Sequence, residues 1–81
     1  MAVSFDVRVV ELPPGGERAS RAAEWRDALV LVDRGEVELD CLGGSRRRFG
    51  RGAVLWLGGL PLRALRNPGA EPAVLVAVSR R

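Results

Sequence analysis

The fold of this chain is decided by the stretch Gly52-Ala53-Val54-Leu55-Trp56-Leu57-Gly58-Gly59-Leu60-Pro61-Leu62-Arg63-Ala64-Leu65-Arg66-Asn67. Two short segments rich in apolar residues, at 53–57 and 62–66, are separated here by two glycines and a proline. Apolar runs divided in this way are typical of strands joined by a turn. Outward from this stretch, turn residues recur about every 8–12 positions, as they do in antiparallel sandwiches and barrels. The sequence therefore predicts an all-β fold.

Alternation of apolar and charged residues places the other strands. Ser4–Val10 and Glu36–Cys41 both alternate, which predicts strands with one buried face, formed in the first case by positions 5, 7 and 9. Only Glu17–Asp27 lacks a clear period, and we expect irregular chain or a short strand there. The expected strands cover residues 4–10, 28–32, 36–41, 46–49, 53–57, 62–66 and 73–78. Seven or eight short strands predict a small antiparallel β-barrel or double-sheet jelly roll.

Composition indicates one small globular domain, residues 1–81, with 47% hydrophobic and 28% charged residues. No apolar run approaches the roughly 18 residues of a membrane span, and the first residues lack a signal-peptide pattern. Together with a single cysteine, Cys41, this predicts a cytoplasmic protein without a membrane partner. All 13 basic residues are arginine, a bias that indicates a GC-rich bacterial genome.

The net charge of +3 does not indicate a nucleic-acid partner. Arg46-Arg47-Arg48 forms the densest basic cluster, but only Phe49 supplies an aromatic ring near it. We interpret this run as a solvated strand whose charges protect a sheet edge.

The spacing of residues 15–78 resembles that of the cupins, a superfamily of small β-barrels. Their second motif runs Gly, five residues, Pro, one, Gly, two, His, three, Asn. Gly52 and Asn67 fit its two ends, Gly58 and Leu60 replace its proline and second glycine, and Arg63 falls on its histidine. The resemblance implies a cupin-like barrel over nearly the whole chain.

The first cupin motif runs Gly, five residues, His, one, His, four, Glu, six, Gly, and Gly15 and Gly35 fit its ends. The positions of its two histidines and its glutamate hold Arg21, Ala23 and Ala28. Cupin metals take imidazole and carboxylate ligands, whereas arginine is permanently cationic and alanine has no donor atom. We therefore expect no metal and no cofactor at the matched positions.

Four residues form the predicted ligand-binding set. Arg21 and Arg63 could put positive charge where the cupin metal sits, so that a guanidinium would hold a carboxylate or phosphate at the barrel mouth. In the alternative interpretation, Arg63 reaches the rim or pairs with an internal carboxylate. Trp56 is a core or interface anchor that could also line a pocket. Cys41 lies on an apolar face and behaves as a small hydrophobic residue.

The remaining chemistry is restricted because the chain contains no histidine. Histidine-assisted Ser or Cys nucleophiles are excluded, and no catalytic residue is predicted. A substitute metal site would need acidic and thiol ligands, and the only candidates that we consider are Glu17, Glu24, Asp27 and Cys41.

Two expected strands, Ala28–Val32 and Ala73–Val78, have no polar face. A strand that is apolar on both sides is covered on both sides, and a small barrel covers only the inner one. A second copy of the chain is the simplest cover for the outer side, so a homodimer is predicted. Because Ala28 matches an inward cupin position, Leu29 and Leu31 should point outward.

Three functions follow from these observations. The leading one is a metal-free cupin-like binding or accessory module, a homodimer that binds a small ligand, such as an anion, or a protein partner. The alternative is a metal-independent isomerase or lyase, with Glu17, Glu24 or Asp27 as base and Arg63 as electrophile. The third is a structural or interaction subunit with a filled barrel. An open pocket favours binding or catalysis, and an interior filled by apolar side chains favours interaction.

Overall fold

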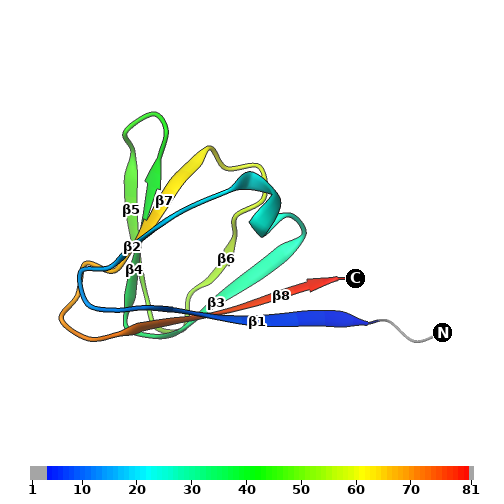
Figure 1. The fold of residues 1–81 in the computed structure, drawn as a ribbon, viewed down its shortest axis with the longest axis horizontal. Coiled ribbons are helices and arrows are strands. Elements are labelled where there is room, and N and C mark those ends of the chain that lie inside the picture. Colours follow the sequence, from blue (N-terminus) through cyan, green and yellow to red (C-terminus); the bar gives the residue numbers. More distant parts are fainter. Residues whose placement is uncertain (1–3, 81) are drawn as a thin grey trace.

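The structure, a computed structural model, describes residues 4–80, except for the side chains of Ala22 and Ala23. It contains eight strands and one short 3-10 helix (Figure 1). The elements are β1 (Phe5–Leu12), β2 (Glu17–Ala19), η1 (Ala22–Trp25), β3 (Ala28–Arg34), β4 (Glu36–Cys41), β5 (Arg46–Gly50), β6 (Val54–Trp56), β7 (Leu62–Arg66) and β8 (Ala73–Arg80). The prediction of an all-β chain is confirmed.

The strands form two four-stranded antiparallel sheets that pack face to face. One sheet has the order β1-β8-β3-β6 and the other β2-β7-β4-β5. The chain crosses repeatedly between them, as in a double-sheet jelly roll (Figure 1). Phe5 pairs with Arg80, so both ends of the described chain lie at the same end of the molecule.

The segment without a clear period is short strand followed by irregular chain, as expected. Glu17–Ala19 pairs with β7, and the four residues Ala22–Trp25 then make a single 3-10 turn. The turn ends at Asp27, whose φ of 55° lies in the left-handed region that aspartate tolerates better than most residues. This turn brings Trp25 into the space between the sheets.

The core lies between the two sheets and is filled by apolar side chains. Trp25 is only 1% exposed, and its indole N–H donates a hydrogen bond to the Ser20 hydroxyl at 2.8 Å. The Arg8 guanidinium covers the Trp25 ring from 5.3 Å, which seals this end of the core. The other large buried side chains come from both sheets and include Val30, Val32, Val37, Leu65 and Leu75.

One strand turns its apolar residues the opposite way from the sequence expectation. In β1 the side chains of Phe5, Val7 and Val9 were expected to be buried, but all three are exposed. The core side of β1 instead carries Arg8 and, further along, Val10. Alternation distinguishes two faces of a strand without saying which of them meets the core. The outer face of β1 also has apolar neighbours, because Val7 and Val9 lie opposite Val78 and Val76 of β8.

Candidate functional site

The outer face of the β1-β8-β3-β6 sheet is apolar. The strand register aligns two rows of four side chains across all four strands. One row is Val9, Val76, Leu31 and Val54, and the other is Val7, Val78, Leu29 and Trp56. Because residues opposite one another in neighbouring strands share a face, the eight side chains form one continuous surface, which we call the apolar face.

The apolar face is open to solvent. Phe5, which shares its side of β1 with Val7 and Val9, extends it toward the chain ends. Seven large side chains on it are between 38% and 66% exposed, and the prediction that Leu29 and Leu31 point outward is confirmed. Monomers rarely leave contiguous apolar patches larger than a few hundred Å² in water. This surface is therefore a strong candidate for an interaction site.

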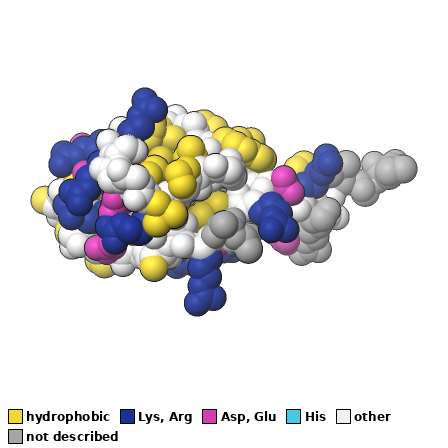
Figure 2. Space-filling model, turned by 90° about the horizontal axis from the view of Figure 1, so that it is seen from above, with side chains coloured by type: hydrophobic (Ala, Val, Ile, Leu, Met, Phe, Trp, Pro, Cys, Tyr) yellow, Lys and Arg dark blue, Asp and Glu magenta, His cyan; other side chains and the backbone are white. Residues whose placement is uncertain are grey.

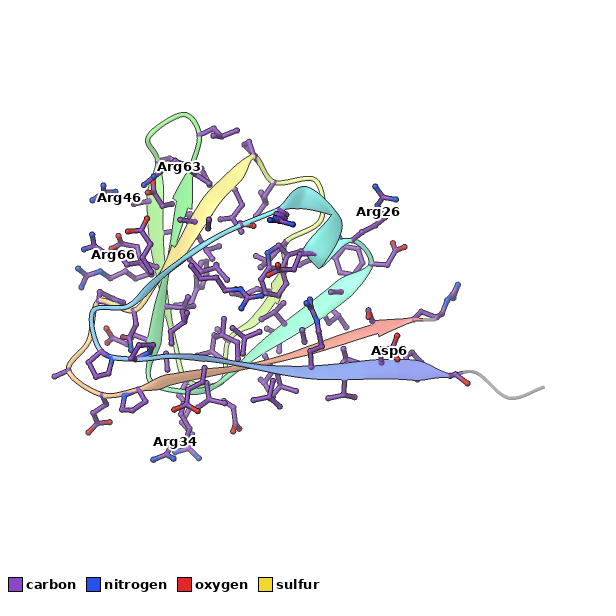
Figure 3. All side chains as sticks on the ribbon, viewed as in Figure 1. Asp6, Arg26, Arg34, Arg46, Arg63 and Arg66 are labelled. Atoms are coloured by element: carbon purple, nitrogen blue, oxygen red, sulfur yellow. The ribbon has the colours of Figure 1, made fainter. Side chains whose placement is uncertain are left out.

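The outer face of the other sheet has the opposite chemistry. Glu38 and Asp40, on the central strand β4, are only 5% and 6% exposed. Four arginines from the neighbouring strands cover them, and Figure 3 shows three of these on the side of the sheet away from the core. Arg48 and Arg66 approach Glu38 at 3.2 and 3.9 Å, Arg46 approaches Asp40 at 3.8 Å, and Arg63 also contacts Asp40. The carboxylates are therefore paired and neutralised.

Arg63 belongs to this charged face. Its guanidinium pairs with Asp40 and lies 3.8 Å from Glu17. The β4–β7 register shifts between Asp40 and Cys41, and the resulting bulge displaces the start of β7 relative to β4. In the alternative interpretation Arg63 pairs with an internal carboxylate; the structure has it paired with Asp40 and Glu17 on the outer face of the sheet.

A pocket of about 340 Å³ opens at the end of the sandwich, between the β4–β5 turn and the β6–β7 connection. Its walls are mainly apolar, and Arg47 and Cys41 also line it. Seen from above, this end of the molecule shows hydrophobic side chains gathered together with arginines beside them (Figure 2). The remaining lining side chains include Leu39, Phe49, Leu60, Pro61 and Ser45.

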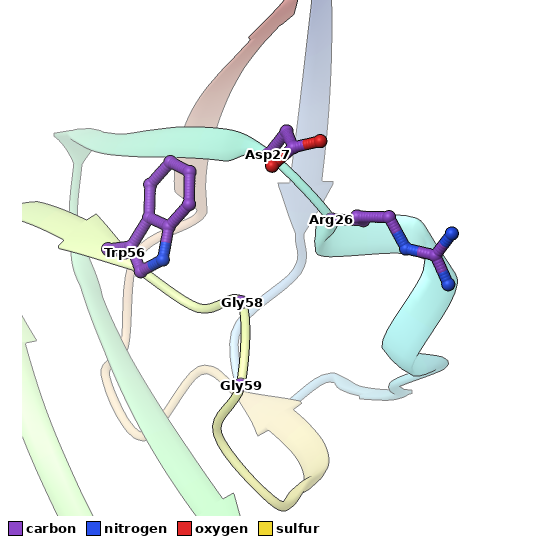
Figure 4. A pocket seen from close by; sticks show the side chains of 5 residues that line it. All are labelled: Arg26, Asp27, Trp56, Gly58 and Gly59. Atoms are coloured by element: carbon purple, nitrogen blue, oxygen red, sulfur yellow. The ribbon is translucent and has the colours of Figure 1, made fainter.

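A second, shallower pocket of about 300 Å³ lies beside Trp56, at the edge of the apolar face. Figure 4 shows the indole on one side and Gly58 and Gly59 on another, with the Arg26 side chain directed away. An added Cβ at Gly58 would lie 3.3 Å from the indole nitrogen, so the glycine allows the loop to approach the ring. Trp56 thus connects this pocket to the apolar face.

The structure separates the four predicted ligand-binding residues. Trp56 and Cys41 line different pockets, Arg63 belongs to the charged face, and Arg21 is exposed where η1 begins. Sequence reasoning did not select Arg47, which was assigned to a solvated basic run. The feature that distinguishes Arg47 is its position opposite Leu39 in the β4–β5 register. This position can be identified only when the pairing of the two strands is known.

Solved structures of cupin proteins are similar to this chain over nearly its whole length. A cupin barrel domain protein from Salinispora arenicola matches with a TM-score of 0.72 and 24% identity, over 91% of this chain and 60% of that one. The cupin domain of an XRE-family transcriptional regulator from Enterobacter cloacae matches with a TM-score of 0.71 and 25% identity, over 91% and 78%. The chain has the cupin fold.

A third cupin structure, a sugar phosphate isomerase from Silicibacter pomeroyi, matches with a TM-score of 0.68 and 25% identity, over 95% of this chain. This chain spans only half of that protein and 60% of the Salinispora protein. No family model matches the sequence, and no curated protein matches it. The similarity therefore establishes the fold and a cupin module, while the activities of the larger proteins are not assigned to this chain.

The cupin metal positions of this chain do not fit a metal ion. Ala28 is buried and has no donor atom, and Arg63 brings a cation that already pairs with two carboxylates. The side chain of Ala23 lies outside the described residues. Within residues 4–80, no three His, Cys, Asp or Glu side chains lie close enough to form a ligand set, so Glu17, Glu24, Asp27 and Cys41 are not brought together.

β5 is an edge strand, as expected, and two of its arginines lie over the carboxylates of β4. In the part of the chain that the structure describes, no helix is long and apolar enough to cross a lipid bilayer.

Proposed function

We propose that this chain is a metal-independent, cytoplasmic cupin module that works as a homodimer, with the apolar face as its dimer interface. The observation that carries the proposal is the alignment of eight apolar side chains in two rows across one four-stranded sheet. Burying such a surface removes apolar area from water, which is the main favourable term in most protein association. Sheets can pack in this way at a spacing of about 10 Å.

A second copy suits this surface because its border is self-complementary. The next row along the sheet is Glu11, Val74 and Arg34, which puts opposite charges on β1 and β3. Figure 3 shows Arg34 projecting from the outer side of this sheet. A two-fold axis running along β8 would bring Glu11 of each copy toward Arg34 of the other. A two-fold interface uses the same patch on both subunits, and the opposite charges at the two ends of this row support such a pairing.

The filled interior favours an accessory or interaction role over catalysis. Trp25 and the core side chains of both sheets occupy the space between them. Of the three carboxylates considered as bases, Glu24 pairs with Arg18 at 3.1 Å and Asp27 lines the pocket beside Trp56, which Arg63 does not line. Only Glu17 lies near Arg63, at 3.8 Å, and there the two side chains form an ion pair. One similar structure is a cupin domain of a transcriptional regulator, which is an accessory setting for this fold.

The dimer is tested with Leu31→Glu, which puts a charge in the middle of the apolar face. We expect the unmodified chain to sediment at micromolar concentration with about twice its 8.7 kDa mass, and the variant to sediment as a monomer. Leu42→Glu is the matched control. It makes the same change at a side chain that is 70% exposed in the β4–β5 turn, and it should leave the dimer intact.

A single monomer mass for the unmodified chain would refute the proposal, as would a Leu31→Glu variant that remains dimeric. If Leu31→Glu fails to fold, Val9→Glu provides a second test. Val9 lies on the edge strand β1 and is 66% exposed, so a charge there disturbs the core less. Circular dichroism of each variant shows whether the fold is retained.

A further inference from the structure

The pocket between the β4–β5 turn and the β6–β7 connection has the composition of a small-molecule site. Its volume of about 340 Å³ is at the lower end of the usual range for ligand pockets. Leu39, Phe49, Leu60 and Pro61 supply apolar walls, and Arg47 supplies a cation. Arg21, Ala28 and Arg63 do not line it, so it is separate from the positions that match the cupin metal ligands.

Arg47 differs from the arginines on either side of it. Arg46 and Arg48 lie over the carboxylates of β4, on the outer face of the sheet. Successive residues of a strand point to opposite faces, so Arg47 is on the same side as Leu39 and Phe49. Its guanidinium lies 5.8 Å from the centre of the Phe49 ring. Within the described residues, no carboxylate lies at ion-pair distance from it, whereas both of its neighbours have one.

We propose that this pocket binds a small monocarboxylate with an apolar body, whose carboxylate is held by Arg47. A guanidinium can donate two parallel hydrogen bonds to a carboxylate. A single arginine balances a single negative charge, and the apolar walls accommodate a short aliphatic chain or an aromatic ring. Inorganic phosphate is a poorer fit because it has no apolar body to contact these walls.

The site adds a ligand class to the module proposed above, and it does not depend on dimerisation. The apolar face lies on the other sheet, and none of the residues that line the pocket belongs to its two rows. Sedimentation measures the dimer and does not enter the binding test. Either proposal can therefore fail while the other stands.

Cys41 makes the proposal directly testable. It is the single cysteine of the chain, and it lines the pocket. Its rate of alkylation by N-ethylmaleimide therefore reports on whether the pocket is occupied. We expect phenylacetate and hexanoate to slow alkylation in a saturable manner. Acetate, which lacks the body, and 2-phenylethanol, which lacks the charge, should give much less protection at the same concentration.

The Arg47→Gln variant identifies the anchor. Hydrogen bonds to a charged group contribute about 1.5–3 kcal/mol, so we expect phenylacetate to bind about tenfold or more weakly to this variant. Arg47→Lys keeps the charge without the planar fork and should have an intermediate affinity. Arg51→Gln is the matched control, because it removes the same charge from the turn after β5, outside the pocket.

Three results would overturn the assignment. One is the absence of protection of Cys41 by either carboxylate. Another is equal protection by 2-phenylethanol, which would make the pocket a simple apolar cavity. The third is an unchanged phenylacetate affinity in Arg47→Gln. Thermal melting of each variant confirms that the fold is intact.

Discussion

At the scale of single residues, Asn67 has the most fully determined role. Its side chain is completely buried, and each of its polar atoms has a partner. The amide nitrogen donates to the carbonyl oxygens of Leu12 and Glu71 at 3.1 and 2.7 Å, and the amide oxygen accepts from the Gly69 N–H at 2.9 Å. Asn67 therefore ties the end of β1 to the connection that leads into β8.

Replacing Asn67 should strongly destabilise the fold. Asn67→Ala removes three hydrogen bonds and leaves the buried Leu12 carbonyl without this partner, so we expect a loss of about 3 kcal/mol in the free energy of unfolding. Urea denaturation measures it. The exposed Ser45→Ala serves as the control and should change stability by less than about 0.5 kcal/mol.

A second substitution separates hydrogen bonding from shape. Asn67→Asp keeps the volume and the acceptor for Gly69, but it turns an oxygen toward the carbonyls of Leu12 and Glu71. Near neutral pH we expect it to be at least as destabilising as Asn67→Ala. A stability equal to that of the unmodified chain would show that the side-chain volume alone matters at this position.

At the scale of elements, the turn from β3 to β4 is where the chain passes from one sheet to the other. Gly35 makes this turn with a φ of 72°, in the left-handed region that favours glycine. It also lies against the start of β8, where an added Cβ would be 2.7 Å from the Pro72 carbonyl oxygen and 2.9 Å from Ala73 Cα. Both the conformation and the close approach require glycine.

Gly35→Ala should cost considerably more than the same change at Gly44. Gly44 has a φ of 87°, but nothing lies within 4 Å of its added Cβ. There we expect only the conformational cost, about 1 kcal/mol. At Gly35 the backbone contacts add strain, and we expect about 3 kcal/mol in total. Equal losses in urea denaturation would show that β8 moves aside to accommodate the methyl group.

At the scale of the whole molecule, the two outer faces of the sandwich differ in chemistry. The β2-β7-β4-β5 sheet covers its outer carboxylates with arginine, and this paired, polar surface is suited to water. The β1-β8-β3-β6 sheet leaves apolar rows open. A chain of 81 residues has a small core, so covering the second face would add considerably to its stability.

Thermal stability should therefore depend on protein concentration. Association that is linked to folding makes the melting temperature rise with concentration, and for a domain of this size we expect about 3 °C for each tenfold increase. Differential scanning calorimetry between about 5 and 500 μM measures the slope. The Leu31→Glu variant should show no slope, and a flat response from the unmodified chain would contradict dimerisation.

The sequence by itself determined the strands and part of the apolar face. Period-two alternation and glycine and proline turns located β3, β4, β5, β7 and β8 to within two residues, because both signals are local. Two fully apolar strands predicted an apolar outer face with Leu29 and Leu31 on it, which the exposure of both confirms. The spacing of residues that resembles the two cupin motifs predicted the cupin fold, which this chain shares with the solved structures.

Only the tertiary structure decided which side chains face one another. Arg63 pairs with Asp40 and Glu17 next to the β4–β7 bulge. The bulge and the pairing both depend on contacts between strands, so no local sequence pattern predicts them. Arg47 stands apart from Arg46 and Arg48 only once β5 is registered against β4. Alternation defines two faces of a strand, but the packing of one sheet against the other selects the face that becomes core, the face that pairs charges and the face that stays open to solvent.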